Sequence, residues 1–198
     1  MGVKNFSFIT SVSNSFQLKN TKMTLEENML HLKTMMNILD NEMKSNFAID
    51  KNKILQTNLL PYKVKLYVSC INECPIEGKI PITNIVDKLL ELNKLKIDKI
   101  CLSDTCGTLT KKEFIDIISN ITKKGLEPNK ISLHFHVKPE RESEIEEIVH
   151  SALSYGIYEY DVSNIQSGGC SVTMEKEKMA PNLNYEQFYK FLVNYLLK

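Results

Sequence analysis

Two histidines separated by one residue lie in the stretch "ISLHFHV", where His134 and His136 interrupt an otherwise apolar, β-rich run. Successive side chains of a strand point to opposite faces, so residues two apart share a face and lie about 7 Å apart. Both imidazoles can therefore approach one ion, and imidazole is a common ligand of divalent metals. The same spacing suits two histidines that form hydrogen bonds within a packed layer, and spacing alone leaves both interpretations open.

A glycine-rich loop and a strand end supply further polar side chains. Gly168 and Gly169 precede Cys170, and two glycines give a hinge that can carry a thiol over a site. A thiol whose pKa moves toward neutrality can transfer a proton, although an incidental loop cysteine would look the same. In "SDTCG", Asp104 and Thr105 end an apolar run, a position where Asp also serves as a helix cap or turn former.

The remaining cysteines and histidines receive structural interpretations. The chain has five cysteines, an odd number without a secretory signal, which favours reduced thiols over a disulfide framework. No second pair follows Cys70 and Cys74 at zinc-ribbon spacing, so we do not expect structural zinc there. His31 and His150 fall in predicted helices, where a surface or packing role is the usual one.

Composition indicates one globular domain and excludes several classes of partner. The chain has 198 residues, of which 42% are hydrophobic. Lys plus Arg number 25 against 24 for Asp plus Glu, so no basic surface predicts nucleic-acid binding. No apolar run approaches the ~20 residues of a membrane span, and the N-terminal stretch has no signal or transit pattern. We therefore expect a cytoplasmic chain with neither a nucleic-acid nor a membrane partner.

Hydrophobic periodicity predicts alternating strands and helices. Thr24 with Glu27 and Thr110 with Glu113 have capping-box spacing and mark two helix starts. The segment 41–63 is rich in Asn and Lys and predicts a loop with at most a short helical turn. Strands are expected over 3–12, 64–69, 99–103, 131–137 and 158–164, and helices over 24–40, 82–95, 111–125, 139–156 and 184–197.

Five strand–helix units with a repeat of roughly 30 residues indicate parallel strands joined by right-handed crossovers. The expected class is α/β, either a doubly wound sheet or part of a (β/α)8 barrel. A complete barrel takes about 250 residues and eight such units. Both architectures bind ligands at the carboxyl ends of their strands, which is where His134 and His136 lie.

Several motifs carry a resemblance to a known family. The stretch "YVSCINECPIEG" is similar to the strand-five signature of that family, and "SDTCG" to its Asp-Thr-x-Gly segment. The stretch "HFH" is similar to its metal-binding His-x-His, and "GGC" to its catalytic cysteine loop. The N-terminal stretch "VKNFSFITSVSNSFQLKN" is similar to its fourth strand and the following helix. Together they resemble the 3-hydroxy-3-methylglutaryl-CoA (HMG-CoA) lyases. The resemblance implies a single incomplete TIM-barrel domain over residues 1–198, matching strands four to eight, with a polar insertion around 40–62.

The resemblance also implies a set of metal ligands. The family binds a divalent cation, Mg or Mn, through the histidine pair, an Asn and a first-strand Asp, which implies His134 and His136 as ligands. Counting from the cysteine without gaps places the family's Asn at Met179. "NLNYEQF" instead matches the family's Asn-x-x-x-Glu helix start if the loop carries about three extra residues, so Asn182 is the preferred ligand, with Glu186 as its neighbour.

By the same resemblance, Cys170 is the catalytic residue. Substrate-binding or supporting roles fall on Asp104, Thr105, Gly168, Gly169 and Glu186. The implied reaction, part of leucine degradation, cleaves the acyl-CoA substrate HMG-CoA to acetyl-CoA and acetoacetate.

The sequence also departs from the family. The first-strand Arg and Asp have no counterpart, and "HFHVKPER" lacks the Asp that follows the second histidine. A hard cation held without a carboxylate is bound weakly. Two hypotheses follow. One is a lyase homologue, truncated at both ends, that a homo-oligomer, a complementing chain or an upstream segment makes active. The other is an inactive homologue that at most binds metal or acyl-CoA.

Overall fold

The structure is a computed structural model that describes residues 3–49, 62–165 and 167–198. All five expected strands and five expected helices are present, together with one further helix and a small hairpin. The elements are β1 (Asn5–Ser11), α1 (Asn14–Thr21), α2 (Leu25–Ile49), β2 (Lys63–Ser69), β3 (Glu73–Cys74), β4 (Gly78–Lys79), α3 (Ile82–Asn93), β5 (Lys99–Asp104), α4 (Lys111–Lys123), β6 (Ile131–Phe135), α5 (Glu142–Ser154), β7 (Glu159–Asp161) and α6 (Tyr185–Leu196).

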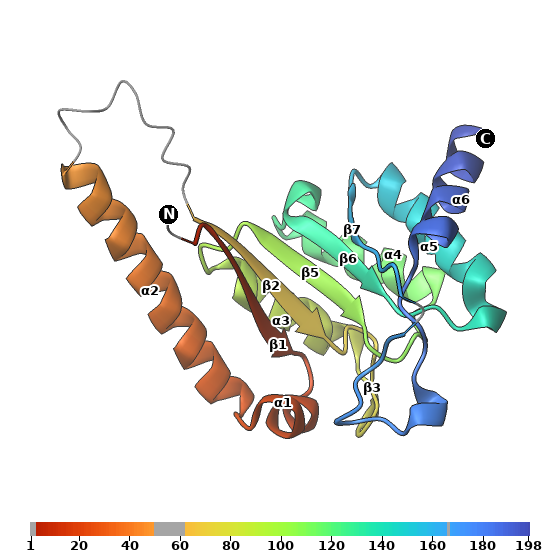
Figure 1. The fold of residues 1–198 in the computed structure, drawn as a ribbon, viewed down its shortest axis with the longest axis horizontal. Coiled ribbons are helices and arrows are strands. Elements are labelled where there is room, and N and C mark those ends of the chain that lie inside the picture. Colours follow the sequence, from red (N-terminus) through yellow and green to blue (C-terminus); the bar gives the residue numbers. More distant parts are fainter. Residues whose placement is uncertain (1–2, 50–61, 166) are drawn as a thin grey trace.

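The main sheet has five parallel strands in the order β1-β2-β5-β6-β7 (Figure 1). Each crossover therefore moves one strand further in the same direction, and the order never reverses. A doubly wound sheet requires such a reversal, whereas a barrel segment does not. The α/β architecture is that of a partial (β/α)8 barrel, as predicted.

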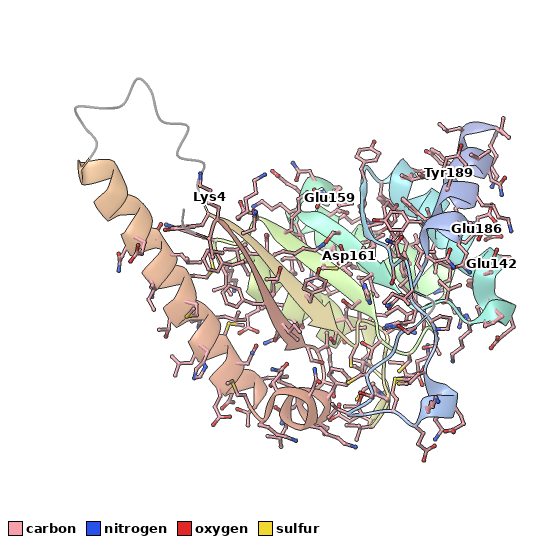
Figure 2. The ribbon with its side chains drawn as sticks, in the orientation of Figure 1. Lys4, Glu142, Glu159, Asp161, Glu186 and Tyr189 are labelled. Carbon is pink, nitrogen blue, oxygen red and sulfur yellow. The ribbon has the colours of Figure 1, made fainter. Side chains whose placement is uncertain are left out.

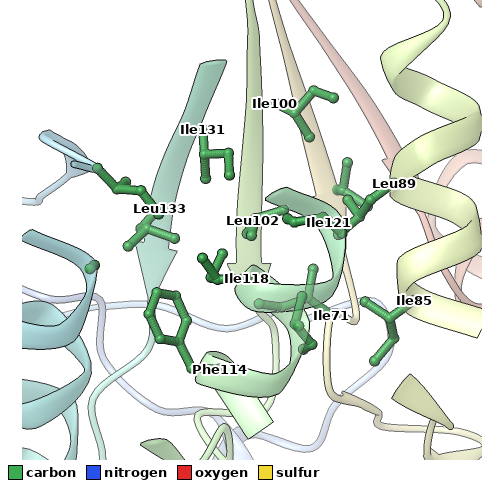
Figure 3. Close-up of a cluster of buried hydrophobic side chains, with 14 of the residues drawn as sticks. Ile71, Ile85, Leu89, Ile100, Leu102, Phe114, Ile118, Ile121, Ile131 and Leu133 are labelled. Carbon is green, nitrogen blue, oxygen red and sulfur yellow. The ribbon is translucent and has the colours of Figure 1, made fainter. Parts of the chain in front are cut away.

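One face of this sheet is apolar and packs against the helices. Leu102 of β5 and Leu133 and Phe135 of β6 are fully buried, and Phe114 and Ile118 of α4 belong to the same cluster (Figure 3). Each such side chain contributes about 1.5–3 kcal/mol by leaving water. This face therefore supplies most of the packing that holds the strands in place.

The opposite face is polar and concave. Cys101 of β5 pairs in register with Ser132 of β6, and His134 follows two residues later on the same side. Lys65 of β2 reaches Asp161 of β7, with 2.5 Å between Nζ and Oδ1. Strands three steps apart would lie about 14 Å from each other in a flat sheet, so this contact requires a curved one. The concave face corresponds to the interior of a barrel.

The helix α2 continues where a loop was expected. Its capping box is confirmed, since the Thr24 amide donates to Glu27 at 2.8 Å and the Glu27 amide to the Thr24 hydroxyl at 3.2 Å. The helix runs to Ile49, and neither Gly nor Pro occurs within 41–49 to end it. The prediction of a loop from residue 41 is wrong over this stretch. Residues 50–61 lie outside the described part of the chain, so the insertion around 40–62 stays a prediction.

The sequence analysis missed one short helix and one short hairpin, and it predicted two strands that are longer than those in the structure. Helix α1 has eight residues and starts at Ser13, whose hydroxyl accepts from the Phe16 amide at 3.0 Å. Strands β3 and β4 form a hairpin of two residues each. The expected strands 131–137 and 158–164 shorten to β6 and β7. Elements of this length are too short for hydrophobic periodicity to define.

Other expectations about single residues are met. The second capping box is present, with Thr110 as N-cap and Glu113 as its partner. His31 is exposed on α2, and His150 is buried on α5, where its Nε2 lies 2.8 Å from the Phe191 carbonyl oxygen. All cysteines are free thiols. Within the described ranges, no helix is both long and apolar enough to cross a membrane.

Candidate metal centre

The carboxyl end of β6 brings three predicted metal ligands together. His134 lies on the concave face within β6, and His136 follows the end of the strand. Backbone hydrogen bonds of 2.7 and 2.9 Å join residues 135–137 to residues 181–183, so His136 and Asn182 form an antiparallel bridge. The loop thus places Asn182, the preferred of the two candidate amide positions, beside the histidine pair.

The backbone orients the ring of His136. Its Nδ1 lies 2.8 Å from the carbonyl oxygen of Asp104. A carbonyl oxygen only accepts hydrogen bonds, so Nδ1 carries the proton and Nε2 of the neutral ring keeps its lone pair. Metal-binding histidines are commonly held in this way, with the distal nitrogen donating to a backbone carbonyl. His136 is therefore fixed in the tautomer that a metal ligand needs.

His134 is a neutral imidazole with an unpaired nitrogen. Its ring is nearly perpendicular to that of His136, at 88°, with 5.0 Å between the centroids. Burial, reinforced by the nearby His136, lowers the pKa of His134 to about 4. Its Nδ1 is buried without a hydrogen-bond partner, and such an atom costs about 1–3 kcal/mol. A metal ion held by the pair would offset this cost, so these two residues fit a metal centre.

The glycine-rich loop supports Asn182. The amide nitrogen of the Asn182 side chain donates to the Ser167 carbonyl at 2.7 Å. At Gly168 a Cβ atom would lie 2.6 Å from the Asn182 backbone nitrogen and 2.9 Å from its Oδ1, so only glycine allows this approach. Gly169 has φ of +82° and packs against Met179. The two glycines therefore shape the loop around the asparagine, while Met179 lies against the loop itself.

Asp104 and Thr105 reach the centre only through the backbone. The carboxylate of the fully buried Asp104 accepts from the amides of Thr108 at 3.2 Å and Leu109 at 3.0 Å. Burial raises the pKa of Asp104, although these amides oppose the shift. The Thr105 hydroxyl accepts from the Cys70 amide at 2.8 Å. Both side chains stabilise the turns after β2 and β5, and the carbonyl of Asp104 orients His136.

Cys170 and Glu186 lie away from the histidines in this conformation. Cys170 packs against the buried cluster of Phe16, Cys70 and Cys74, and its thiol lies 3.5 Å from the Asn20 amide oxygen. Glu186 is exposed in the first turn of α6 (Figure 2), whereas its neighbour Tyr185 lines a cavity together with Asp161. The structure does not gather these two side chains with the imidazoles, and their catalytic or supporting roles stay predictions.

A cavity of about 460 Å³ opens beside the histidine pair and contains residues that the sequence analysis missed. Tyr67, His134, Asp161 and Asn182 are among its lining residues. Asp161 pairs in register with His134, and its carboxylate accepts from Lys65. Burial opposes ionisation of Asp161, but the hydrogen bonds from Lys65 and Tyr67 hold its pKa below the usual value. The sequence signal that could have identified this cluster is the spacing of Lys65 and Tyr67, which lie two residues apart and therefore share one face of β2.

The candidate ligands supply only part of the coordination that a divalent metal needs. No group of three or more His, Cys, Asp or Glu side chains in the described ranges is arranged to hold an ion. The candidate ligands are two imidazoles and one amide; imidazole suits transition metals such as Fe²⁺, Ni²⁺ and Zn²⁺, whereas Mg²⁺ and Mn²⁺ prefer oxygen ligands. Remaining coordination positions would need oxygen atoms from substrate, water or further polypeptide.

Comparisons with known proteins agree with the fold. No family model matches the chain. Over 137 residues it is 25% identical to the mitochondrial hydroxymethylglutaryl-CoA lyase of Arabidopsis thaliana, a match that covers 68% of this chain. The HMG-CoA lyase of Bacillus subtilis superposes with a TM-score of 0.72 at 21% identity, and that of Brucella melitensis with 0.72 at 17%. The chain is therefore similar to the HMG-CoA lyases in sequence and in fold.

The likeness to HMG-CoA lyases covers nearly all of this chain but only part of theirs. The superpositions include 97% of this chain and 56% of the Bacillus chain, and 96% and 59% in the Brucella case. The sequence match spans 25% of the Arabidopsis protein. A further HMG-CoA lyase structure, from Acinetobacter baumannii, contains coenzyme A and 3-methylmalate and superposes with a TM-score of 0.72 at 20% identity. The chain therefore spans little more than half of these solved relatives.

Proposed function

We propose that this chain carries part of the active site of a metal-dependent carbon–carbon lyase, which cleaves HMG-CoA to acetyl-CoA and acetoacetate. One observation carries the proposal: His136 is held in its metal-binding tautomer directly opposite Asn182, with His134 beside them. The relationship to HMG-CoA lyases supports the choice of reaction and of an acyl-CoA substrate.

The residues of the centre bind and orient rather than transfer protons. His134 is a neutral imidazole, the Nδ1 of His136 is held by the Asp104 carbonyl, and Asn182 lines the same cavity as His134. A divalent cation bound there would polarise the substrate's oxygen atoms and stabilise the charge that develops as the carbon–carbon bond breaks. The carbonyl of Asp104 maintains the tautomer of His136, so this turn is part of the ligand geometry.

Proton transfer is assigned to Cys170. Its thiol would protonate the carbon that leaves as an enolate, or assist the base that removes the substrate's hydroxyl proton. In the present conformation the thiol contacts Asn20 of α1, so the loop must turn about Gly168 and Gly169 before the thiol reaches a substrate. Loop movements of this kind complete the active sites of many enzymes when substrate binds.

A second candidate function is binding of metal or acyl-CoA without turnover. Two observations favour this alternative: Cys170 lies away from the cavity, and Asp161 forms an ion pair with Lys65. Neither the thiol of Cys170 nor the carboxylate of Asp161 is therefore free to react in this conformation. The two candidates share the metal centre and differ only in the chemical step.

Titration of the 198-residue chain with Mn²⁺, followed by electron paramagnetic resonance, tests the shared centre. His134→Ala should weaken binding by at least about tenfold, because outer-sphere changes alone cost that much. His31→Ala, which changes an exposed histidine on α2, is the matched control and should bind normally. Failure of the folded chain to bind Mn²⁺ would contradict the lyase and leave only acyl-CoA binding from the second candidate. Acetoacetate released from HMG-CoA by the loaded chain favours the lyase, and binding without release favours the second candidate.

A further inference from the structure

Cysteines gather at the carboxyl end of the sheet, outside the metal centre. Cys70 and Cys74 share a buried cluster with Phe16. The thiol of Cys106, in the loop after β5, lies 3.5 Å from the carbonyl oxygen of Glu73, the residue bonded to Cys74. Cys74 and Cys106 are 32 positions apart in sequence, yet the fold places the Cys106 thiol beside the peptide group that links Glu73 to Cys74.

The sulfur of Cys74 is surrounded by hydrogen-bond donors. It accepts from the Ser13 hydroxyl at 3.1 Å and from the backbone amides of Ile76 and Glu77, both at 3.3 Å. These three donors fix the orientation of the Cys74 sulfur at the cavity wall. Cys106 has no such donors. Burial raises its pKa to about 12, and the nearby Glu73 and Asp104 add to this effect. The two thiols therefore differ in their surroundings: three donors orient the sulfur of Cys74, and burial keeps the Cys106 thiol protonated.

A cavity gives small molecules access to both residues. Its volume is about 1,090 Å³, and it lies between the β3–β4 hairpin and the loop 172–181. Cys74 and Cys106 both line it, as does Lys138. This cavity shares no lining residue with the one beside the histidine pair. Cys74 and Cys106 are only 1% and 6% exposed, so hydrogen peroxide would reach their thiols through the wall of this cavity.

We propose that Cys74 and Cys106 form a peroxide-sensitive dithiol that closes to a disulfide. In the first step the Cys74 thiol and hydrogen peroxide give a sulfenic acid and one water. In the second step the Cys106 thiol attacks that sulfur, the S–S bond forms, and the sulfenic oxygen leaves as a second water. Each disulfide thus consumes one peroxide and returns two waters.

Closure would act on His136 through the loop 104–109. This loop holds His136 at two points: the Asp104 carbonyl accepts from Nδ1, and Gly107 packs against the His136 carbonyl. A Cβ at Gly107, whose φ is +62°, would lie 2.8 Å from that carbonyl oxygen, so the two backbone segments are tightly packed here. Drawing Cys106 toward Cys74 must therefore disturb the anchor of His136, and oxidation becomes a way to alter the metal centre.

Peptide mapping by mass spectrometry tests the dithiol. The reduced 198-residue chain is treated with hydrogen peroxide, its remaining thiols are alkylated, and it is digested without reductant. A peptide pair joined through Cys74 and Cys106 is expected, with Cys101 still alkylated. In Cys106→Ser the sulfenic acid at Cys74 should persist and react with dimedone. Cys101→Ser, a control on the concave face, should form the same linked pair. Absence of the link, or a link between other cysteines, overturns the proposal.

Imidazole nitrogen NMR tests the effect on His136 without relying on metal or catalysis. The Nδ1–H signal of His136 should shift when the wild-type chain is oxidised and remain unchanged in peroxide-treated Cys106→Ser or Cys106→Ala, both checked for folding by circular dichroism. An unchanged signal in the oxidised, linked chain would overturn the coupling. Failure of the chain to bind Mn²⁺ would leave both readouts intact, so this proposal and the proposed function fail separately.

Discussion

The two faces of the same five-stranded sheet differ in almost every property. Leu133 and Phe135 of β6 point toward the helices and are fully buried among apolar side chains. Ser132 and His134 alternate with them and point into the concave face, where hydroxyl, imidazole and charged groups gather. One strand therefore contributes to stability with its odd-numbered residues and to the candidate site with its even-numbered ones. Stability and function are separated by side-chain direction rather than by position in sequence.

The largest expected effect on stability comes from substituting, one at a time, two adjacent residues whose side chains point to opposite faces of the sheet. Leu133→Ala removes a fully buried side chain from the helix-facing core and should lower the free energy of unfolding by about 2–5 kcal/mol. Ser132→Ala removes a buried hydroxyl whose neighbour is the weakly hydrogen-bonding thiol of Cys101, and it should change this free energy by about 1 kcal/mol or less. Urea unfolding followed by circular dichroism measures both values. Equal losses would show that the two faces do not divide the roles as described.

A pH effect of intermediate size should come from the concave face. The pKa of His134 is about 4 in the folded chain, below its ordinary value of 6.5. Between these values the unfolded chain binds a proton that the folded chain does not, so stability falls as pH decreases through this window. For His134 alone the loss from pH 7.5 to pH 5 is about 2 kcal/mol.

Urea unfolding in the presence of a chelator measures this loss, and His134→Gln should remove most of it. His31→Gln changes an exposed histidine and should keep the full pH dependence. A His134→Gln variant that loses as much stability as the wild type at pH 5 would contradict the assignment of a buried neutral imidazole.

The smallest effect should distinguish two ion pairs. The side chains of Lys65 and Asp161 are 23% and 26% exposed on the concave face, whereas those of Lys112 and Asp116 are 86% and 39% exposed on α4. Asp161→Asn should cost about 1 kcal/mol, because Lys65 then loses its partner in a partly desolvated place. Asp116→Asn should cost less than about 0.5 kcal/mol. Thermal unfolding at low and high salt separates them, and similar costs would remove the distinction.

Much of the fold could be predicted because its signals are local. Period-two alternation placed His134 on one strand face, and the capping box at Thr110 fixed the start of α4. Helix α1 escaped because eight residues carry too little periodicity. The helix α2 ran past its expected end because Asn and Lys do not terminate a helix in the absence of Gly and Pro.

The candidate site was predictable only where a motif marked it. The expectation of Asn182 beside the histidines rested on motif spacing, and the structure places it there through backbone pairing with His136. Asp161 was missed because its partner Lys65 lies 96 positions away and meets it only when the sheet curves. The position of Cys170 depends on a loop conformation that no local pattern encodes.

The most direct test of the metal centre compares the two candidate amide-ligand positions. We predict that Asn182→Ala weakens Mn²⁺ binding to the 198-residue chain by about tenfold or more, measured by electron paramagnetic resonance. Met179→Ala, the position that gapless counting selects, should leave binding unchanged, since Met179 packs against Gly169 and does not line the histidine cavity. Normal binding by Asn182→Ala, or weakened binding by Met179→Ala alone, would contradict the centre formed by His134, His136 and Asn182.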